Sequence, residues 1–201
     1  MCKAIFITGT DTGVGKTYVA KLMAGALRQQ GYKVAVMKPI VTGSMDDVNR
    51  LKAVHVYFFK TALAPSVAAK LEHKNISIDR ILSAYKKLCQ ENDFVIVEGI
   101  GGLLVPIKKG YLVADLIKDM AAPAIIVARP GLGTINHTLL TVKYAQNAGI
   151  KVLGVIFNET KKTKIGACER TNPKEIEREA DVPILGWVKY GSKKNKLRIF
   201  R

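Results

Sequence analysis

Residues 4–17 read Ala-Ile-Phe-Ile-Thr-Gly-Thr-Asp-Thr-Gly-Val-Gly-Lys-Thr, a short apolar run that passes into a glycine-rich segment ending in Gly15-Lys16-Thr17. An amphipathic stretch, Lys16–Gln30, follows directly. A strand, a glycine-rich turn and a helix start place successive backbone N–H groups where they bind phosphate oxygens. The segment therefore predicts a P-loop, in which Lys16 reaches the terminal phosphates and the hydroxyl of Thr17 ligates magnesium.

The loop departs from the regular pattern at its first position. That pattern has glycine at position 10, where this chain has Thr10, and Gly9 comes one residue early. We therefore expect a variant P-loop. The alternative is a glycine-rich turn between strand and helix that binds no nucleotide, and the coincidence of strand, loop, Gly-Lys-Thr and helix argues against it.

Beyond the P-loop, short apolar runs alternate with longer amphipathic stretches, which is typical of buried parallel strands joined by helices. The predicted strands are Ala4–Thr8, Val34–Lys38, Phe94–Glu98, Ala124–Ala128, Val152–Asn158 and Ile184–Val188. The clearest predicted helices are Lys16–Gln30, Ile78–Glu91 and Thr134–Ala148. We expect residues 1–201 to form a single α/β domain with a doubly wound, mostly parallel sheet flanked by helices, and a basic C-terminal tail at about 189–201.

Composition limits the classes of function. No segment has the roughly 18 uninterrupted apolar residues of a membrane helix, and the three cysteines lack the spacing of a disulfide framework or zinc site, so we expect a cytoplasmic protein. The net charge of +16 attracts polyanions, but the lysines are spread along the chain without an aromatic-interleaved basic stripe. We therefore expect ATP and an anionic small molecule, and no nucleic acid, as partners.

Two charged residues end the second and third predicted strands. Lys38 would lie in the phosphate cleft beside the P-loop, where it can stabilise transferring phosphoryl oxygens; the alternative is a lysine that merely reaches solvent from a strand end. Glu98 is the candidate metal ligand, since magnesium prefers hard oxygen ligands, and Thr17 with one of Asp46 and Asp47 would complete the set. The alternatives are a buried structural glutamate and a pair of helix-capping aspartates.

Together these segments resemble the dethiobiotin synthetase family. The resemblance rests on the P-loop, on Lys38-Pro39 with Thr42-Gly43, on Val97-Glu98-Gly99 with Gly101-Gly102, and on residues 132–137, Leu-Gly-Thr-Ile-Asn-His, in that order and spacing. It implies that 7,8-diaminopelargonate takes up CO2 as a carbamate, that ATP phosphorylates the carbamate, and that the neighbouring amine closes the ring of dethiobiotin. It also implies a homodimer.

The resemblance assigns roles residue by residue. Lys38, Lys16 and Thr12 would contact the carbamate and phosphates, and Thr17, Asp47 and Glu98 would hold Mg2+. Asn158 would read the adenine edge, although an asparagine that caps a strand end is the alternative. The ATP site would further include Gly13, Val14, Gly15, Tyr18, Gly99 and Gly101. Thr42 would contact the substrate, and the backbone of Leu132, Gly133 and Thr134 would bind its carboxylate.

Two other classes of protein stay open from the sequence. A partition-type P-loop ATPase that binds DNA would explain the charge, but such proteins usually carry an extra lysine early in the loop, where this chain has Thr10 or Asp11. An amidoligase relative would need a glutamine-hydrolysing domain, for which 201 residues leave no room. Within the resemblance, Ser66 stands where many members have histidine, so any role of that histidine is absent. Lys189 stands where members have proline, and nucleotide selectivity is therefore expected to be relaxed.

Overall fold

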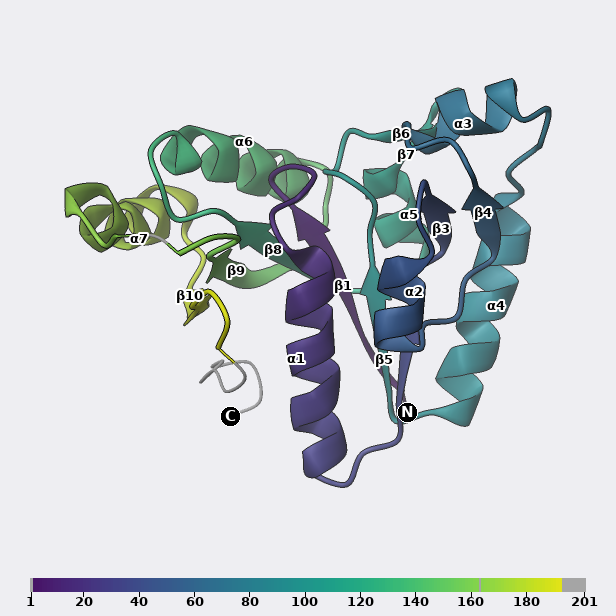
Figure 1. Ribbon diagram of the computed structural model, residues 1–201, viewed down its shortest axis with the longest axis horizontal. Coiled ribbons are helices and arrows are strands. Elements are labelled where there is room, and N and C mark those ends of the chain that lie inside the picture. Colours follow the sequence, from purple (N-terminus) through teal and green to yellow (C-terminus); the bar gives the residue numbers. More distant parts are fainter. Residues whose placement is uncertain (1, 163, 193–201) are drawn as a thin grey trace.

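The computed structural model describes residues 2–162 and 164–192, and its centre is a six-stranded parallel sheet in the order β10-β9-β8-β1-β5-β2 (Figure 1). The predicted fold class is confirmed. The strands of this sheet are β1 (Lys3–Gly9), β2 (Val34–Met37), β5 (Phe94–Glu98), β8 (Ala124–Ala128), β9 (Val152–Asn158) and β10 (Ile184–Val188). All six predicted strands are present, with ends displaced by at most one residue.

Helices cover both faces of the sheet, because successive strand residues point to opposite faces and both faces carry apolar side chains that must be buried. Ile5 and Ile7 of β1 pack toward α1 (Lys16–Gln29), whereas Phe6 packs with α4 (Ile78–Glu91) and α5 (Val113–Asp119). The face with α4 and α5 continues under α6 (Thr134–Asn147) and α7 (Ala167–Ala180). Figure 1 shows α6 and α7 gathered over the β8–β10 half of the sheet.

Smaller elements lie around the β2 end of the molecule. They are α2 (Asp46–Leu51), α3 (Pro65–Leu71), the parallel pair β3 (Ile40–Thr42) and β4 (Tyr57–Phe59), and the antiparallel pair β6 (Pro106–Lys108) and β7 (Tyr111–Leu112). None of these was predicted by residue range, because strands of two or three residues and helices of six or seven are too short to show a clear hydrophobic period. Of these elements, β3 and α2 border the cleft described below.

Two further sequence expectations concern the C-terminal tail and membrane-spanning segments. Residues 193–201, most of the expected basic tail, lie outside the described residues. Within the part that the structure describes, no helix is both long and apolar enough to span a membrane.

Strand β5 lies between β1 and β2, and all five of its residues are buried. Ile96 at its middle is fully buried. We expect Ile96→Ala to lower the free energy of unfolding by about 3 to 4 kcal/mol, because the cavity adds to the lost apolar transfer energy. Urea unfolding measures this, with Lys87→Ala on exposed α4 surface as the control at under about 0.5 kcal/mol. Equal effects of the two substitutions would contradict this account of the core.

Candidate nucleotide and catalytic site

The P-loop occupies the carboxyl end of β1, the middle of the sheet. Strand β1 ends at Gly9 and α1 begins at Lys16, so residues 10–15 form the loop seen at the top of α1 in Figure 1. The Lys16 ammonium curls back and donates a hydrogen bond to the carbonyl oxygen of Asp11 at 3.0 Å. Lys16 is 7% exposed, so its charge is held inside the concavity of the loop.

Gly15 and Asn158 join this loop to β9. The amide of Asn158 donates to the carbonyl oxygen of Val14 at 2.9 Å. Gly15 has φ +93°, and a Cβ at this position would lie 2.1 Å from Asn158 Nδ2. Only glycine therefore permits this close approach. Asn158 Oδ1 is buried and has no hydrogen-bond partner among the described residues.

Lys38 is the first residue after β2, and it bridges two carboxylates. Its Nζ lies 2.8 Å from Asp47 Oδ2, on the first turn of α2, and 3.0 Å from Glu98 Oε1, at the end of β5. The Thr17 hydroxyl donates to the same Glu98 oxygen at 2.6 Å. Four side chains predicted from four separate segments therefore meet at one point, which we call the Lys38 cluster: Thr17, Lys38, Asp47 and Glu98.

The charges of the Lys38 cluster perturb one another. Burial alone lowers the pKa of Lys38, but the charge of Glu98 and the hydrogen bond to Asp47 outweigh it and raise the pKa, so the ammonium stays protonated. Burial would raise the pKa of Asp47, and the hydrogen bond from Lys38 reverses this and lowers it. Burial raises the pKa of Glu98, opposed by Lys38 and the Thr17 hydroxyl. Glu98 therefore sits where additional positive charge stabilises its ionised form.

A cleft of about 600 Å³ opens over the P-loop and the Lys38 cluster. It brings together most of the predicted site: Thr12, Gly13, Gly15, Lys16, Thr17, Tyr18, Lys38, Thr42, Asp47, Glu98, Gly99 and Gly101. Val14, a fully buried residue of the loop, and Asn158, which donates to its carbonyl oxygen, do not line the cleft. Asp46 does not line it either.

Leu132, Gly133 and Thr134 lie elsewhere, at the start of α6. Leu132 and Thr134 line a separate cavity of about 280 Å³, which also includes Thr10 and Arg129. Because Thr10 belongs to the P-loop, this cavity and the cleft lie on two sides of the same loop. An ion pair of 3.2 Å between Arg129 and Asp11 ties the start of the loop to this second side.

Sequence reasoning missed three polar residues of the cleft, Lys21, Ser44 and Arg50, and two apolar ones, Val41 and Ile100. Lys21 stands four residues after Thr17 on α1, and Arg50 stands three residues after Asp47 on α2. Residues three and four apart share one face of a helix, so the spacing from predicted ligands was the available signal. Both add positive charge at the mouth of the cleft, where it favours an anionic ligand.

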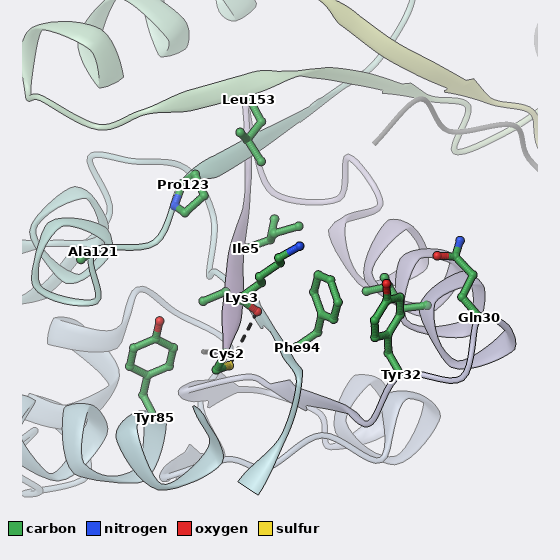
Figure 2. A pocket seen from close by; sticks show the side chains of 12 residues that line it. Cys2, Lys3, Ile5, Gln30, Tyr32, Tyr85, Phe94, Ala121, Pro123 and Leu153 are labelled. Carbon is green, nitrogen blue, oxygen red and sulfur yellow. Dashed lines mark hydrogen bonds between the residues drawn. The ribbon is translucent and has the colours of Figure 1, made fainter. Parts of the chain in front are cut away.

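Another cavity of about 600 Å³ lies at the opposite, amino end of the sheet (Figure 2). Figure 2 shows Lys3, Tyr32 and Phe94 around it, near the starts of β1 and β5. Lys3 points its ammonium over the Phe94 ring, 5.7 Å from the ring centroid. Ligands of open parallel sheets bind at the carboxyl ends of the strands, and this cavity has no P-loop, so the cleft over Lys16 is the candidate active site.

This fold and cleft define the class: a P-loop nucleotide-binding protein of the α/β type. Solved structures of that class share the fold. The chain superposes on a chain of the MinC:MinD cell division protein complex from Aquifex aeolicus, with TM-score 0.64, 18% identity and coverage of 96% of this chain and 83% of that one. It also superposes on MinD bound to Mg-ADP from Pyrococcus horikoshii, with TM-score 0.60, 20% identity and coverage of 94% and 82%. At these identities the likeness concerns the fold alone.

Sequence comparison narrows the class to one family. A family model described as an AAA domain matches residues 3–196. The ATP-dependent dethiobiotin synthetase of Methanococcus vannielii is 45% identical to this chain, and the alignment covers 92% of each protein. The one of Bacillus licheniformis is 43% identical, and the alignment covers 92% of this chain and 84% of the relative. The relative in Methanocaldococcus jannaschii is 42% identical over 92% and 93%. The chain belongs to the ATP-dependent dethiobiotin synthetase family, and it is therefore an enzyme of the ligase class.

Lys16 generates a pH prediction. Burial is the main cause that lowers its pKa to about 8, below the ordinary value of 10.5. Below pH 8 the ammonium is present to bind phosphate oxygens, whereas above it binding must first take up a proton. We expect affinity for ADP without metal to fall by up to about tenfold for each pH unit above 8. Calorimetric titration between pH 7 and 9.5 measures this.

Lys16→Arg is the control for that titration. A guanidinium keeps its charge throughout this range, so the variant is expected to bind more weakly but with a flat pH profile. An affinity of the wild-type protein that stays constant up to pH 9.5 would contradict the lowered pKa of Lys16.

Proposed function

We propose that this enzyme forms dethiobiotin from 7,8-diaminopelargonate, CO2 and ATP, with release of ADP and phosphate. The observation that carries the proposal is Lys38, whose ammonium lies between Asp47 and Glu98 in the same cleft as the P-loop lysine, in a member of the dethiobiotin synthetase family. A nucleotide on the P-loop would direct its terminal phosphate toward this second cation.

The proposed chemistry has three steps. An amine of the diamine adds to CO2 and loses a proton, which gives a carbamate. A carbamate oxygen then attacks the terminal phosphorus of ATP, the bond to ADP breaks, and a carbamoyl phosphate results. The second amine attacks the carbamoyl carbon, the carbon–oxygen bond to phosphate breaks, and a proton leaves as the cyclic urea closes. Each step thus uses one of the two amines or the terminal phosphate.

The chain's lysines suit the second step, because negative charge there is spread over the transferring phosphoryl group. Lys16, at the start of α1, and Lys38, directly after β2, both line the cleft, and each would lower the cost of charge on those oxygens. Thr12 lies in the loop between them and would donate to the carbamate or the phosphates. These roles give each predicted catalytic residue a contact with reacting atoms.

The Lys38 cluster also fits Mg2+. Glu98 Oε2 is buried without a hydrogen-bond partner among the described residues, and the Thr17 hydroxyl and the Asp47 carboxylate lie beside it. Few hard oxygens, completed by phosphate oxygens and water, are what magnesium prefers. We propose that Thr17, Asp47 and Glu98 hold the ion. When bound, it would neutralise charge on the phosphates of ATP.

The remaining predicted residues would bind the two ends of the organic substrate. Thr42, at the end of β3, lines the cleft beside Lys38 and would contact the diamine. The backbone N–H groups of residues 132–134, at the start of α6, would bind a carboxylate, as helix starts do; that of Thr134 would first release the carbonyl oxygen of Gly131, to which it donates at 3.2 Å. Because their cavity is separate from the cleft, we propose that they serve the cleft of a partner subunit in a homodimer.

The DNA-binding alternative has less support. The solved MinD structures share only the fold, at 18 and 20% identity. At the early loop position of the expected extra lysine, Asp11 instead pairs with Arg129. We propose that the +16 charge serves small anionic substrates.

Lys38→Ala tests the catalytic proposal. We expect diamine-dependent release of ADP from MgATP and bicarbonate to fall by about 100-fold or more, because one preorganised cation on the phosphoryl oxygens is lost. Binding of MgADP should persist, since ADP lacks the terminal phosphate. Lys109→Ala, at an exposed position between β6 and β7, should leave turnover unchanged. Retained turnover in Lys38→Ala would remove Lys38 from the mechanism.

Leu140→Asp tests the dimer. Leu132, Leu140 and Tyr144 expose 92, 64 and 36% of their surface around α6, and Leu140 and Tyr144 share one helix face. We expect a carboxylate there to convert a dimer to monomers and to abolish dethiobiotin formation while MgADP still binds. Sedimentation velocity measures the change, with Lys87→Asp as the control. A wild-type protein that is monomeric at micromolar concentration would contradict the proposal.

A further inference from the structure

Two basic residues that line the cleft, Lys21 and Arg50, have no part in the chemistry above. Lys21 stands on the second turn of α1, and Arg50 stands on the last turn of α2. Both residues are exposed. Neither forms an ion pair with a carboxylate among the described residues, in contrast to Lys38. Their charges therefore face solvent at the mouth of the cleft without an acid in contact to neutralise them.

The two basic residues stand on neighbouring helices. Helices α1 and α2 are in contact, and Leu51 of α2 is buried in the same core cluster as Ala20 and Met23 of α1. This packing fixes the backbone positions of Lys21 and Arg50, whereas their long exposed side chains keep rotational freedom. Such side chains hold charge at the mouth without a fixed geometry. They suit attraction at a distance better than a precise contact.

The buried charges of the cleft nearly cancel one another for a distant ligand. Lys16 and Lys38 contribute two positive charges, and the ionised carboxylates of Asp47 and Glu98 contribute two negative ones. Three of these residues, Lys16, Lys38 and Glu98, are only 7, 8 and 2% exposed. Equal numbers of opposite charges close together exert little net force on a charge far from them. The residues that bind phosphates therefore contribute little to drawing a nucleotide in from solution.

Lys21 and Arg50 supply the positive charge that remains. They are the only other charged residues among the described residues that line the cleft, so four cations stand against two carboxylates. Exposed charges act over roughly one Debye length, about 10 Å at 0.1 M salt. A cleft lined by an excess of one sign focuses this field and raises the association rate of a ligand of the opposite sign. The mouth of this cleft is thus built to attract a polyanion.

We propose that Lys21 and Arg50 form a capture pair: their charges speed the association of a nucleoside polyphosphate with the cleft, where the buried residues then hold its phosphates. The capture pair acts on association, because charges at the rim of a site change the on-rate and its salt dependence more than the lifetime of the complex. Its effect grows with the charge of the ligand, so ATP gains more than ADP. The inference requires a nucleotide on the P-loop and is independent of the proposed organic substrate.

Replacement of both Lys21 and Arg50 by glutamine tests the capture pair. We expect the association rate constant of a fluorescent ADP analogue, without metal, to fall about tenfold at about 25 mM salt and about twofold at about 0.3 M, because salt screens the lost attraction. The dissociation rate constant should stay within about twofold. Stopped-flow fluorescence measures both constants, and the fall should be larger for the corresponding ATP analogue. Each single replacement should lower the association rate constant about threefold at the lower salt concentration.

Charge-conserving substitutions separate attraction from contact. Lys21→Arg and Arg50→Lys keep the charge but change the hydrogen-bonding geometry. Both variants should associate at the wild-type rate. Faster dissociation in Arg50→Lys with an unchanged association rate would instead indicate direct contact of Arg50 with the bound phosphates, and it would overturn the proposal.

Lys86→Gln combined with Lys87→Gln is the matched control. It removes the same net charge from exposed positions near the end of α4, on the other face of the sheet. Equal slowing in the two double variants would overturn the proposal, and so would an association rate within twofold of wild type after loss of both Lys21 and Arg50 at low salt. The diamine is absent from these measurements. A protein that shows the expected slowing but no diamine-dependent turnover would refute the proposed reaction and leave this inference standing.

Discussion

The buried carboxylate of Glu98 is the constraint around which the site is organised. An ionised group at 2% exposure is stable only when charges and donors compensate it. Lys38 supplies the charge from the end of β2, and Thr17 supplies a donor from the first turn of α1. Both contacts use the same oxygen, so they fix how the nucleotide-binding helix and two strands meet. The second oxygen, without a partner among the described residues, marks the direction in which a cation would complete the set.

The same arrangement explains how a simple fold can be specialised. The P-loop alone binds phosphates, and many proteins with different functions share it. Here a second lysine, paired with Asp47 and Glu98, stands in the cleft in place of the extra lysine that partition-type ATPases carry within the loop. In the proposed reaction, the phosphate to be transferred would meet two cations, Lys16 at the start of α1 and Lys38 after β2. Residues at the start of α6 line a separate cavity on the other side of the P-loop.

Sequence reasoning predicted those parts of the molecule that are local in sequence. The β1–P-loop–α1 unit and the six parallel strands follow from apolar runs and glycine spacing, and Lys38 and Glu98 follow from their positions at strand ends. The resemblance to a family separated Asp47 from Asp46 as a ligand, and in the structure Asp47 forms the ion pair with Lys38. Apart from the Lys38 cluster, contacts that depend on the register and packing of distant elements were not predicted. The hydrogen bonds that the Glu159 carboxylate accepts from Trp187 and Tyr190 span about 30 positions of the sequence, and they depend on the register of β9 and β10.

The central claim is that an oxygen of the carbamate attacks the terminal phosphate of ATP in the Lys38 cleft. Incubation with 18O-labelled CO2, MgATP and 7,8-diaminopelargonate tests it most directly, with mass spectrometry of dethiobiotin and phosphate before the label exchanges with water. The account predicts dethiobiotin together with phosphate that carries one 18O atom, because the attacking oxygen leaves with the phosphate when the ring closes. Absence of dethiobiotin, or release of unlabelled phosphate alone, would contradict it.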